Sequence, residues 1–443
     1  MNSNPLAKQF TPISILKFAL PNIIMMVFIS LYTIIDGMFI SRLVGELALS
    51  AINMFYPVTS VQLGIGIMLG TGGSAIIATK LGKGEKEEAK QDFTSIVLTA
   101  GVLGVIIAVV CLLFINKILI FLGTSNAQMQ DATVYAKILL AFSPMMFLQT
   151  VFQMFFVTAG KPTLGLVLTI LGGVTNMVLD YLFMGPFEMG VAGAAIATGL
   201  GYCVPAVSGL LYFWLSKKGT IYFVKFHSRP KMLLKACLNG SSEMVSNVAI
   251  AVTTFLFNII FMKYWAENGV AAITMLSYYQ FVFSAMFIGF SLGVSPIISY
   301  KYGAEDNEQL KKIIRFSMLF VVVSSLLVFA FSQLTIKYSL SIFTNVGSPV
   351  YNIAIKGFAI YAIQFLFMGF SIFSSALFTA FSNGVVSAII SISRTFIFLV
   401  CSILLLPYLW GETGVWFAVP IAEFLGIIVS ITFLICYKKK YKY

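Results

Sequence analysis

The chain has few of the residues that build catalytic and metal sites. Its 443 residues include one histidine, and only 10% of them are charged. A soluble domain is roughly a quarter charged, so a water-soluble fold is excluded. A membrane-embedded enzyme is disfavoured because the loops carry no acidic or metal-binding motif, and a channel because no filter loop is present. Five cysteines lie scattered without paired spacing, which excludes a disulfide framework and a cysteine metal site. They are Cys111, Cys203, Cys237, Cys401 and Cys436.

Long apolar stretches dominate what is present. The chain is 59% hydrophobic with a mean hydropathy of +0.96. The stretches are continuous rather than alternating, which predicts transmembrane helices and not a barrel. A spanning helix needs about 20 apolar residues. Breaks at charges, Gly and Pro delimit twelve candidates, at 14–40, 47–81, 93–121, 132–158, 162–184, 190–215, 233–262, 269–301, 313–342, 351–380, 384–406 and 413–437.

The net charge of +12 is distributed between the apolar spans, so membrane topology explains it better than nucleic-acid binding. If both termini and the even-numbered loops share one side, that side holds 21 of the 28 basic residues and the other holds six, with Arg394 inside a span. This bias predicts cytoplasmic termini and an even number of helices. The first apolar stretch is long and lacks a cleavage pattern, so we expect a retained helix and not a signal peptide.

A polar linker divides the candidate helices six and six. The segment Ser216–Lys231 lies at the midpoint of the chain and contains His227, which we expect to be a solvated residue. We therefore predict an N-terminal six-helix lobe at 1–215, a cytoplasmic linker at 216–232 and a C-terminal six-helix lobe at 233–443.

The two halves resemble each other at one fixed spacing along the chain, which we call the repeat offset. Gly70–Gly82 aligns with Ser291–Gly303, and the same offset pairs Ala51 with Ala272 and Thr158 with Thr379. A repeat of six helices places both copies in the same sense in the membrane. The predicted fold is therefore an all-α integral membrane protein of twelve transmembrane helices, in two six-helix bundles related by a pseudo-two-fold axis along the membrane normal.

Ionisable residues inside spans cost roughly 2.5–3.5 kcal/mol each on insertion scales, so each needs a reason. Asp36 and Asp180 reach the same outer layer of the N-terminal bundle, with Asn176 one turn beneath Asp180 and Thr198 at the depth of Asn176. Carboxylate, amide and hydroxyl oxygens suit a small cation or a shared proton. The alternative is that these groups only hydrogen-bond helices together or lie in interfacial water.

Three further ionisable residues fall within spans of the C-terminal half. Arg394 and Glu423 come to similar depth on the last two helices, which predicts a structural ion pair. Glu243 lies about ten residues into the seventh helix. It either contacts substrate or joins this pair, and the sequence leaves both interpretations open.

Four ordered motifs resemble those of MATE (multidrug and toxic compound extrusion) transporters, and the resemblance covers essentially the whole chain. The motifs are Leu20-Pro21 with Asp36–Ile40 and Gly45; the Gly-rich stretch 70–84; Phe156–Pro162; and Asn176-x3-Asp180 with Val191–Ala195 and Thr198. The resemblance implies a prokaryotic inner-membrane exporter with two six-helix lobes, driven by proton or sodium influx. It also carries a cation site onto Asp36, Asn176, Asp180 and Thr198, and a hinge onto Pro21.

One part of the chain departs from that family. The sodium-coupled branch has a carboxylate several residues after a Gly-x-Pro in helix 7. Here the matching stretch, Leu238–Glu243, lacks the proline, and its carboxylate comes too early. That C-lobe site is therefore not transferred, and no metal is expected beyond sodium at the coupling site.

These observations predict a secondary antiporter that exports amphipathic, often cationic drugs or metabolites by alternating access. We expect H⁺ or Na⁺ as the coupling ion, no other cofactor, small molecules and membrane lipid as partners, no nucleic acid, and a monomer. A flippase for a lipid-linked substrate is the alternative. Arg394 as the one basic residue deep in a span argues against it, since pyrophosphate binding calls for several.

Overall fold

The computed structural model describes residues 4–217 and 219–443, so Lys218 of the predicted linker lies outside the described residues. Within them the chain is helical and contains no strand. The α-helices are α1 (Pro12–Leu43), α2 (Glu46–Lys83), α3 (Lys86–Leu113), α4 (Ile115–Phe121), α5 (Asn126–Ala141), α6 (Ser143–Thr158), α7 (Pro162–Met184), α8 (Gly190–Leu215), α9 (Pro230–Gly303), α10 (Asn307–Phe343), α11 (Pro349–Tyr361), α12 (Phe365–Ala380), α13 (Gly384–Ile392) and α14 (Leu399–Tyr441).

Most of these helices can cross a membrane. In the described part of the chain, nine helical stretches are long and apolar enough, and the pair α5–α6, bent by 55°, makes a tenth. This confirms an all-helical, multi-pass membrane protein. Two of the stretches turn sharply at one residue of positive φ, α9 at Ala266 and α14 at Gly411. A single left-handed residue is enough to redirect a helix, so no loop separates the segments on either side.

Four predicted boundaries were wrong by six or more residues, one of them the start of the ninth span, at Asn307 rather than 313. The third span begins at Lys86 rather than 93, and it stops at Leu113. Charged residues were taken as breaks, but Glu87 and Glu88 lie in the first turn of α3, where acidic side chains are favourable. The fourth span begins at Asn126 rather than 132, after a capping box formed by Ser125 and Gln128.

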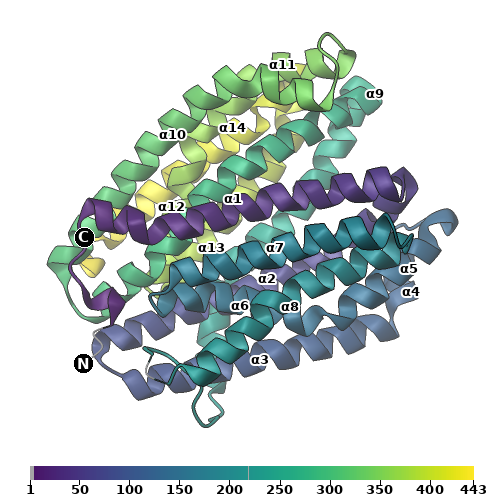
Figure 1. Ribbon diagram of the computed structural model, residues 1–443. Coiled ribbons are helices and arrows are strands. Elements are labelled where there is room, and N and C mark those ends of the chain that lie inside the picture. Colours follow the sequence, from purple (N-terminus) through teal and green to yellow (C-terminus); the bar gives the residue numbers. More distant parts are fainter. Residues whose placement is uncertain (1–3, 218) are drawn as a thin grey trace.

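The backbone repeats itself at the offset that the sequence predicts. Residues of positive φ recur at the repeat offset, at the junctions between helices. These pairs are Gly45 with Ala266, Gly84 with Glu305, and Gly190 with Gly411. Helices from the two halves of the chain form two neighbouring groups, α1 runs along their boundary, and both termini lie at the same end (Figure 1).

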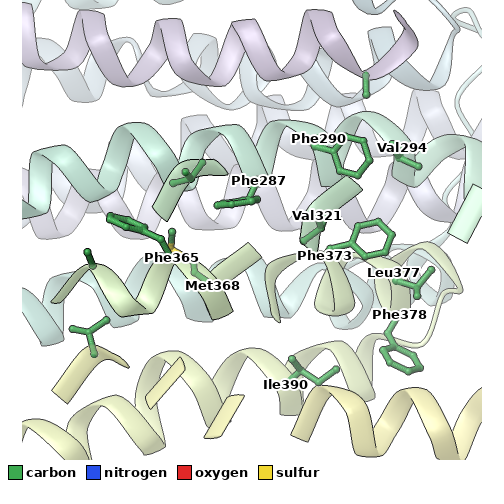
Figure 2. Packing of buried hydrophobic residues seen from close by; sticks show 14 of the residues in the cluster. Phe287, Phe290, Val294, Val321, Phe365, Met368, Phe373, Leu377, Phe378 and Ile390 are labelled. Carbon is green, nitrogen blue, oxygen red and sulfur yellow. The ribbon is translucent and has the colours of Figure 1, made fainter. Parts of the chain in front are cut away.

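Each half has its own apolar core. In the C-terminal half, aromatic side chains of α9 and α12 interlock with Val321 of α10 and Ile390 of α13 (Figure 2). The N-terminal half has two smaller clusters, one between α3, α6 and α8 around Phe152 and Phe213, and one around Phe55 and Tyr135. The C-terminal core also includes Phe10, Phe18 and Ala19 from the start of the chain, so α1 packs on helices of both halves.

Glycines bring the halves into backbone contact at the end that holds the termini. A methyl group added at Gly72 of α2 would overlap the carbonyl oxygen of Ala236 in α9, and one at Gly240 of α9 would overlap that of Met68 in α2. Small residues allow such close approach between helices in lipid, where van der Waals packing is the main attraction. No side chain fits between α2 and α9 at this level.

Replacing Gly240 with alanine is expected to push α9 away from α2. The added methyl group meets backbone, which cannot rotate aside, so we expect the folded protein to lose about 1–3 kcal/mol, as in overpacked cores. A thermal unfolding scan in detergent measures this. Gly37→Ala is the matched control, because nothing lies within 4 Å of a methyl group there. Equal melting temperatures for both variants would contradict the contact.

Candidate cation site and its surroundings

Two consecutive glycines of α7 bring a helix close on either side. A methyl group on Gly173 would lie 2.6 Å from Phe28 Cε1 of α1, and one on Gly172 would lie 2.8 Å from the carbonyl oxygen of Gly201 in α8. Real Cβ atoms do not approach so closely, so only glycine permits this packing. Helix α7 is therefore held between α1 and α8, one turn before Asn176.

The carboxyl groups of Asp36 and Asp180 meet in this packed region. They are close enough to share a hydrogen bond when one is protonated, and Asn176 lies beside Asp180. Asp180 is fully buried and Asn176 is 4% exposed. Asp36 Oδ1, both carboxyl oxygens of Asp180 and both amide atoms of Asn176 have no hydrogen-bond partner among the described residues. Buried polar atoms are rarely left unpaired, so these five atoms fit a small cation, a proton or water.

Three tyrosines surround the carboxyl pair, and the sequence analysis missed them. Tyr32 of α1 neighbours Asp36, Tyr135 of α5 neighbours both carboxyl groups, and Tyr202 of α8 neighbours Tyr32 and Tyr135. Phenolic hydroxyls can donate to or accept from a bound group. Tyr32 is one helical turn before Asp36, a spacing that could have revealed it. Tyr135 comes from a distant helix, and no local pattern indicates it.

Two further predicted residues, Thr198 and Pro21, are described by their positions in α8 and α1. Thr198 lies on α8 one turn before Tyr202, and the described part of the chain shows no hydrogen bond from its hydroxyl. Pro21 lies inside α1, which continues through it without a break. Proline has no N–H to donate to the carbonyl one turn earlier, so this position is the weak point of α1.

Arg394 and Glu423 form the ion pair that their depth indicates. The Arg394 Nη1 atom donates to Glu423 Oε1 at 2.8 Å, and both side chains are almost buried. Arg394 lies in a π-helical turn, Ser393–Phe398, and its side chain packs on Gly426. The C-terminal half therefore holds its own cation in the form of a guanidinium group.

Glu243 does not reach this pair. No ion pair joins it to Arg394 within the described residues. Its side chain instead lines a cavity of about 10 Å³ between the halves, which has room for about one water molecule. Hydroxyl-bearing residues of both halves line the same cavity, namely Thr71, Ser74, Ser295 and Thr379. Ser74 and Ser295 are related by the repeat, and Glu243 is the one carboxylate in this lining.

Comparisons with known proteins agree with the geometry. A family model described as MatE matches residues 21–182 and again residues 243–404. The chain belongs to the MatE family. The starts of the two matches, at positions 21 and 243, are separated by the repeat offset to within one position. Family membership makes the protein a membrane transporter rather than an enzyme, which confirms both predictions.

Relatives and solved structures extend along the full chain. The protein is 24% identical to the multidrug export protein MepA of Staphylococcus saprophyticus, over 94% of this chain and 92% of that one. It is similar to a MATE solved in complex with MaL6, with a TM-score of 0.94 and 23% identity over all of both chains. An outward-facing MATE family transporter of the MOP superfamily matches with a TM-score of 0.93 and 23% identity, over 100% of this chain and 99% of that chain. These structures confirm the fold of this MatE protein.

Removing one partner of the ion pair is expected to destabilise the MatE protein. Glu423→Gln leaves the Arg394 guanidinium buried without a counter-charge, at a cost of about 3–5 kcal/mol. The double variant Arg394→Met/Glu423→Leu removes both charges and is expected to recover most of that loss. The melting temperatures of the original protein, the single variant and the double variant in detergent test this expectation. A single variant as stable as the original would show that the pair is not needed.

Proposed function

We propose that this protein is a secondary antiporter, which exports amphipathic, often cationic small molecules in exchange for inward-moving protons or sodium ions. One observation carries the proposal, the adjacent carboxyl groups of Asp36 and Asp180 with their unpaired oxygen atoms. Two buried carboxylates repel each other when both are charged and unpaired. A proton or small cation removes that repulsion, so ion binding changes how tightly α1 packs against α7.

The proposed topology has twelve membrane crossings. Dividing α9 at Ala266 and α14 at Gly411, and counting α5–α6 once, gives six crossings before the linker and six after it. The positive-φ pairs at the repeat offset support two lobes, 1–215 and 233–443, joined by a linker at 216–232 and related by an axis along the membrane normal. The charge bias supports cytoplasmic termini in a prokaryotic inner membrane.

Coupling between the ion and the substrate depends on movement of the two halves relative to each other. The glycine contacts close the space between α2 and α9 at the end that holds the termini. In alternating access, the end that holds the termini opens while the opposite end of the molecule closes. If the ion and the substrate favour opposite conformations, reciprocal linkage makes each promote release of the other. Pro21 is the proposed hinge, because α1 carries Asp36 and has one hydrogen bond fewer there.

The proposed substrate class rests on the residues that line the cavity between the halves and on the names of the relatives. MepA is named a multidrug export protein, and Glu243 is a half-buried carboxylate among hydroxyl groups. The carboxylate favours cationic molecules, and the apolar residues Met154 and Leu292 in the same lining favour amphipathic ones. The flippase alternative is not favoured, because the guanidinium of Arg394 is already paired with Glu423. We propose a monomer that needs membrane lipid and no cofactor other than the coupling ion.

Neutralising the carboxyl pair is expected to stop ion-driven export. In Asp36→Asn or Asp180→Asn an amide replaces the group that gains and loses the ion, so we expect dye efflux from energised vesicles to fall at least about tenfold, a loss of about 1.4 kcal/mol or more in coupling. Proton and sodium gradients are imposed separately, which identifies the ion. Asp131→Asn, on α5, is the control. Undiminished ion-dependent efflux in Asp36→Asn would overturn the coupling role.

Glu243→Gln is expected to weaken binding of cations selectively. With the carboxylate removed, affinity for a cationic dye should fall about tenfold, which corresponds to about 1.4 kcal/mol, while a neutral dye of similar shape should bind as before. Equilibrium binding to the purified protein measures both. The control is Glu267→Gln, which removes an exposed carboxylate elsewhere on α9. Equal loss for the two dyes would mean that Glu243 shapes the cavity and does not attract charge.

A further inference from the structure

Two segments that lie outside the α-helices cross between the halves at the end that holds the termini. We call Asn4–Thr11, which leads into α1, the N-terminal strap, and Ile221–Arg229, which leads into α9, the linker strap. Each strap packs on the half of the molecule opposite to the helix it leads into. The straps lie at the same end of the molecule as the backbone contacts between α2 and α9.

The N-terminal strap is fastened to the C-terminal half. The backbone N–H of Phe10 donates to Gln309 Oε1 at 3.0 Å, and Lys301 Nζ donates to the carbonyl oxygen of Ala7 at 3.3 Å. Leu6 is fully buried and Phe10 is 4% exposed, and both belong to the core of the C-terminal half. The opposite side of this strap packs against the other half, where Pro5 leaves no room for a side chain at position 160.

The linker strap is fastened to the N-terminal half. Val224 N–H donates to Thr94 Oγ1 at 3.1 Å, and Ser95 Oγ donates to the carbonyl oxygen of His227 at 2.8 Å. The ring of His227 itself is exposed, so the residue contributes its backbone, consistent with a solvated side chain. Phe223 packs on Phe93, with ring centroids 5.1 Å apart.

Ion pairs fix the end of the linker strap. Arg229, the residue before α9, contacts the fully buried carboxylate of Asp92 at 3.1 Å and that of Glu88 at 3.3 Å. Lys80 of α2 contacts the same two carboxylates at 2.7 Å. Arg229 thereby ties the start of α9 to α3 of the other half.

The two fastenings are related by the internal repeat. The repeat offset pairs Lys80 with Lys301 and Glu88 with Gln309. In the N-terminal half, Glu88 in the first turn of α3 holds Arg229 and is itself paired with Lys80, in the last turn of α2. In the C-terminal half, Gln309 in the first turn of α10 holds Phe10, and Lys301 in the last turn of α9 holds Ala7. Two equivalent, oppositely directed attachments resist separation of the halves at this end.

We propose that the two straps form a releasable clasp, which holds this end of the transporter shut and must detach before the end can open. The inference rests on the alternating access proposed above. Most of the fastenings are ion pairs and hydrogen bonds at the water-facing end, which water can replace when the straps lift. The clasp therefore sets how often the protein opens toward the side that holds both termini.

A native cysteine reports on this opening. Cys237 lies on α9, next to Ala236 at the glycine contact, and is half-buried against the core of the N-terminal half. Because it packs against the other half, its alkylation by N-ethylmaleimide should become faster when the halves separate. Cys401 and Cys436 are exposed and serve as references within the same molecule. Peptide mass spectrometry follows each cysteine over time in the full-length protein, without substrate or ion gradient.

The variants Arg229→Ala and Gln309→Ala each loosen one strap, and the double variant loosens both. We expect the double variant to raise the alkylation rate of Cys237 about tenfold over the original protein, which corresponds to about 1.4 kcal/mol, with a smaller rise in each single variant. Rates at Cys401 should not change. Arg315→Ala, which removes an exposed cation of α10 at the same end, is the control and should have no effect.

Unchanged alkylation of Cys237 in all strap variants would overturn the clasp. So would a rise shared equally by Cys203 within the N-terminal half, because that pattern indicates general loosening of the fold. If the double variant fails to fold, the two single variants decide. The measurement involves no transport, so its failure is distinct from a failure of ion-driven efflux in the original protein, which would instead overturn the proposed antiport.

Discussion

Direct backbone contact between α2 and α9 is the constraint on which the rest of the structure depends. Helices in lipid gain little from burying apolar surface against one another, so association relies on close packing. Gly72 and Gly240 supply that contact, and Gly82 and Gly303, which the repeat relates, supply a second one nearer the helix ends. Because this end is packed to the backbone, movement between the halves must open it as a unit, and the straps lie where they can control that opening.

The two halves have the same backbone arrangement but differ in how their buried charges are balanced. The N-terminal half leaves the carboxyl groups of Asp36 and Asp180 without a cation of its own. The positions equivalent to them in the C-terminal half are Phe257 and Cys401, and the buried carboxylate there, Glu423, is neutralised by Arg394. A fixed guanidinium cannot leave. In the antiport that we propose, this asymmetry favours the N-terminal half for the exchangeable ion and gives the other half a permanent charge balance.

Helix α1 connects the features that these proposals use. It begins at the N-terminal strap, contains Pro21, packs against Gly289 and Gly293 of α9, and reaches Asp36 about 36 Å from its start, at a rise of about 1.5 Å per residue. A change in packing between α1 and α7 at the carboxyl pair and a change at the strap thus act on the same rigid element. Because the proposed ion site and the proposed clasp both include α1, movement of this helix affects both of them.

The sequence by itself determined the membrane class, most helix positions, the repeat and the ionisable residues that lie within spans. Those properties depend on composition and local spacing, because a buried charge or an interrupted apolar run is visible without knowing its neighbours. The repeat offset read from aligned motifs reappears in the backbone at Gly190 and Gly411. The pairing of Arg394 with Glu423 also followed from depth alone.

Only the tertiary structure decided which distant groups meet. It brought Tyr135 to the carboxyl pair, and it placed Glu243 between the halves, where no ion pair among the described residues joins it to Arg394. It also laid each strap on the opposite half. Depth along a helix follows from the constant rise per residue and can be counted from the sequence. Rotation of each helix about its axis, and which neighbour it faces, are set by the packing of all the helices together, which no single segment encodes.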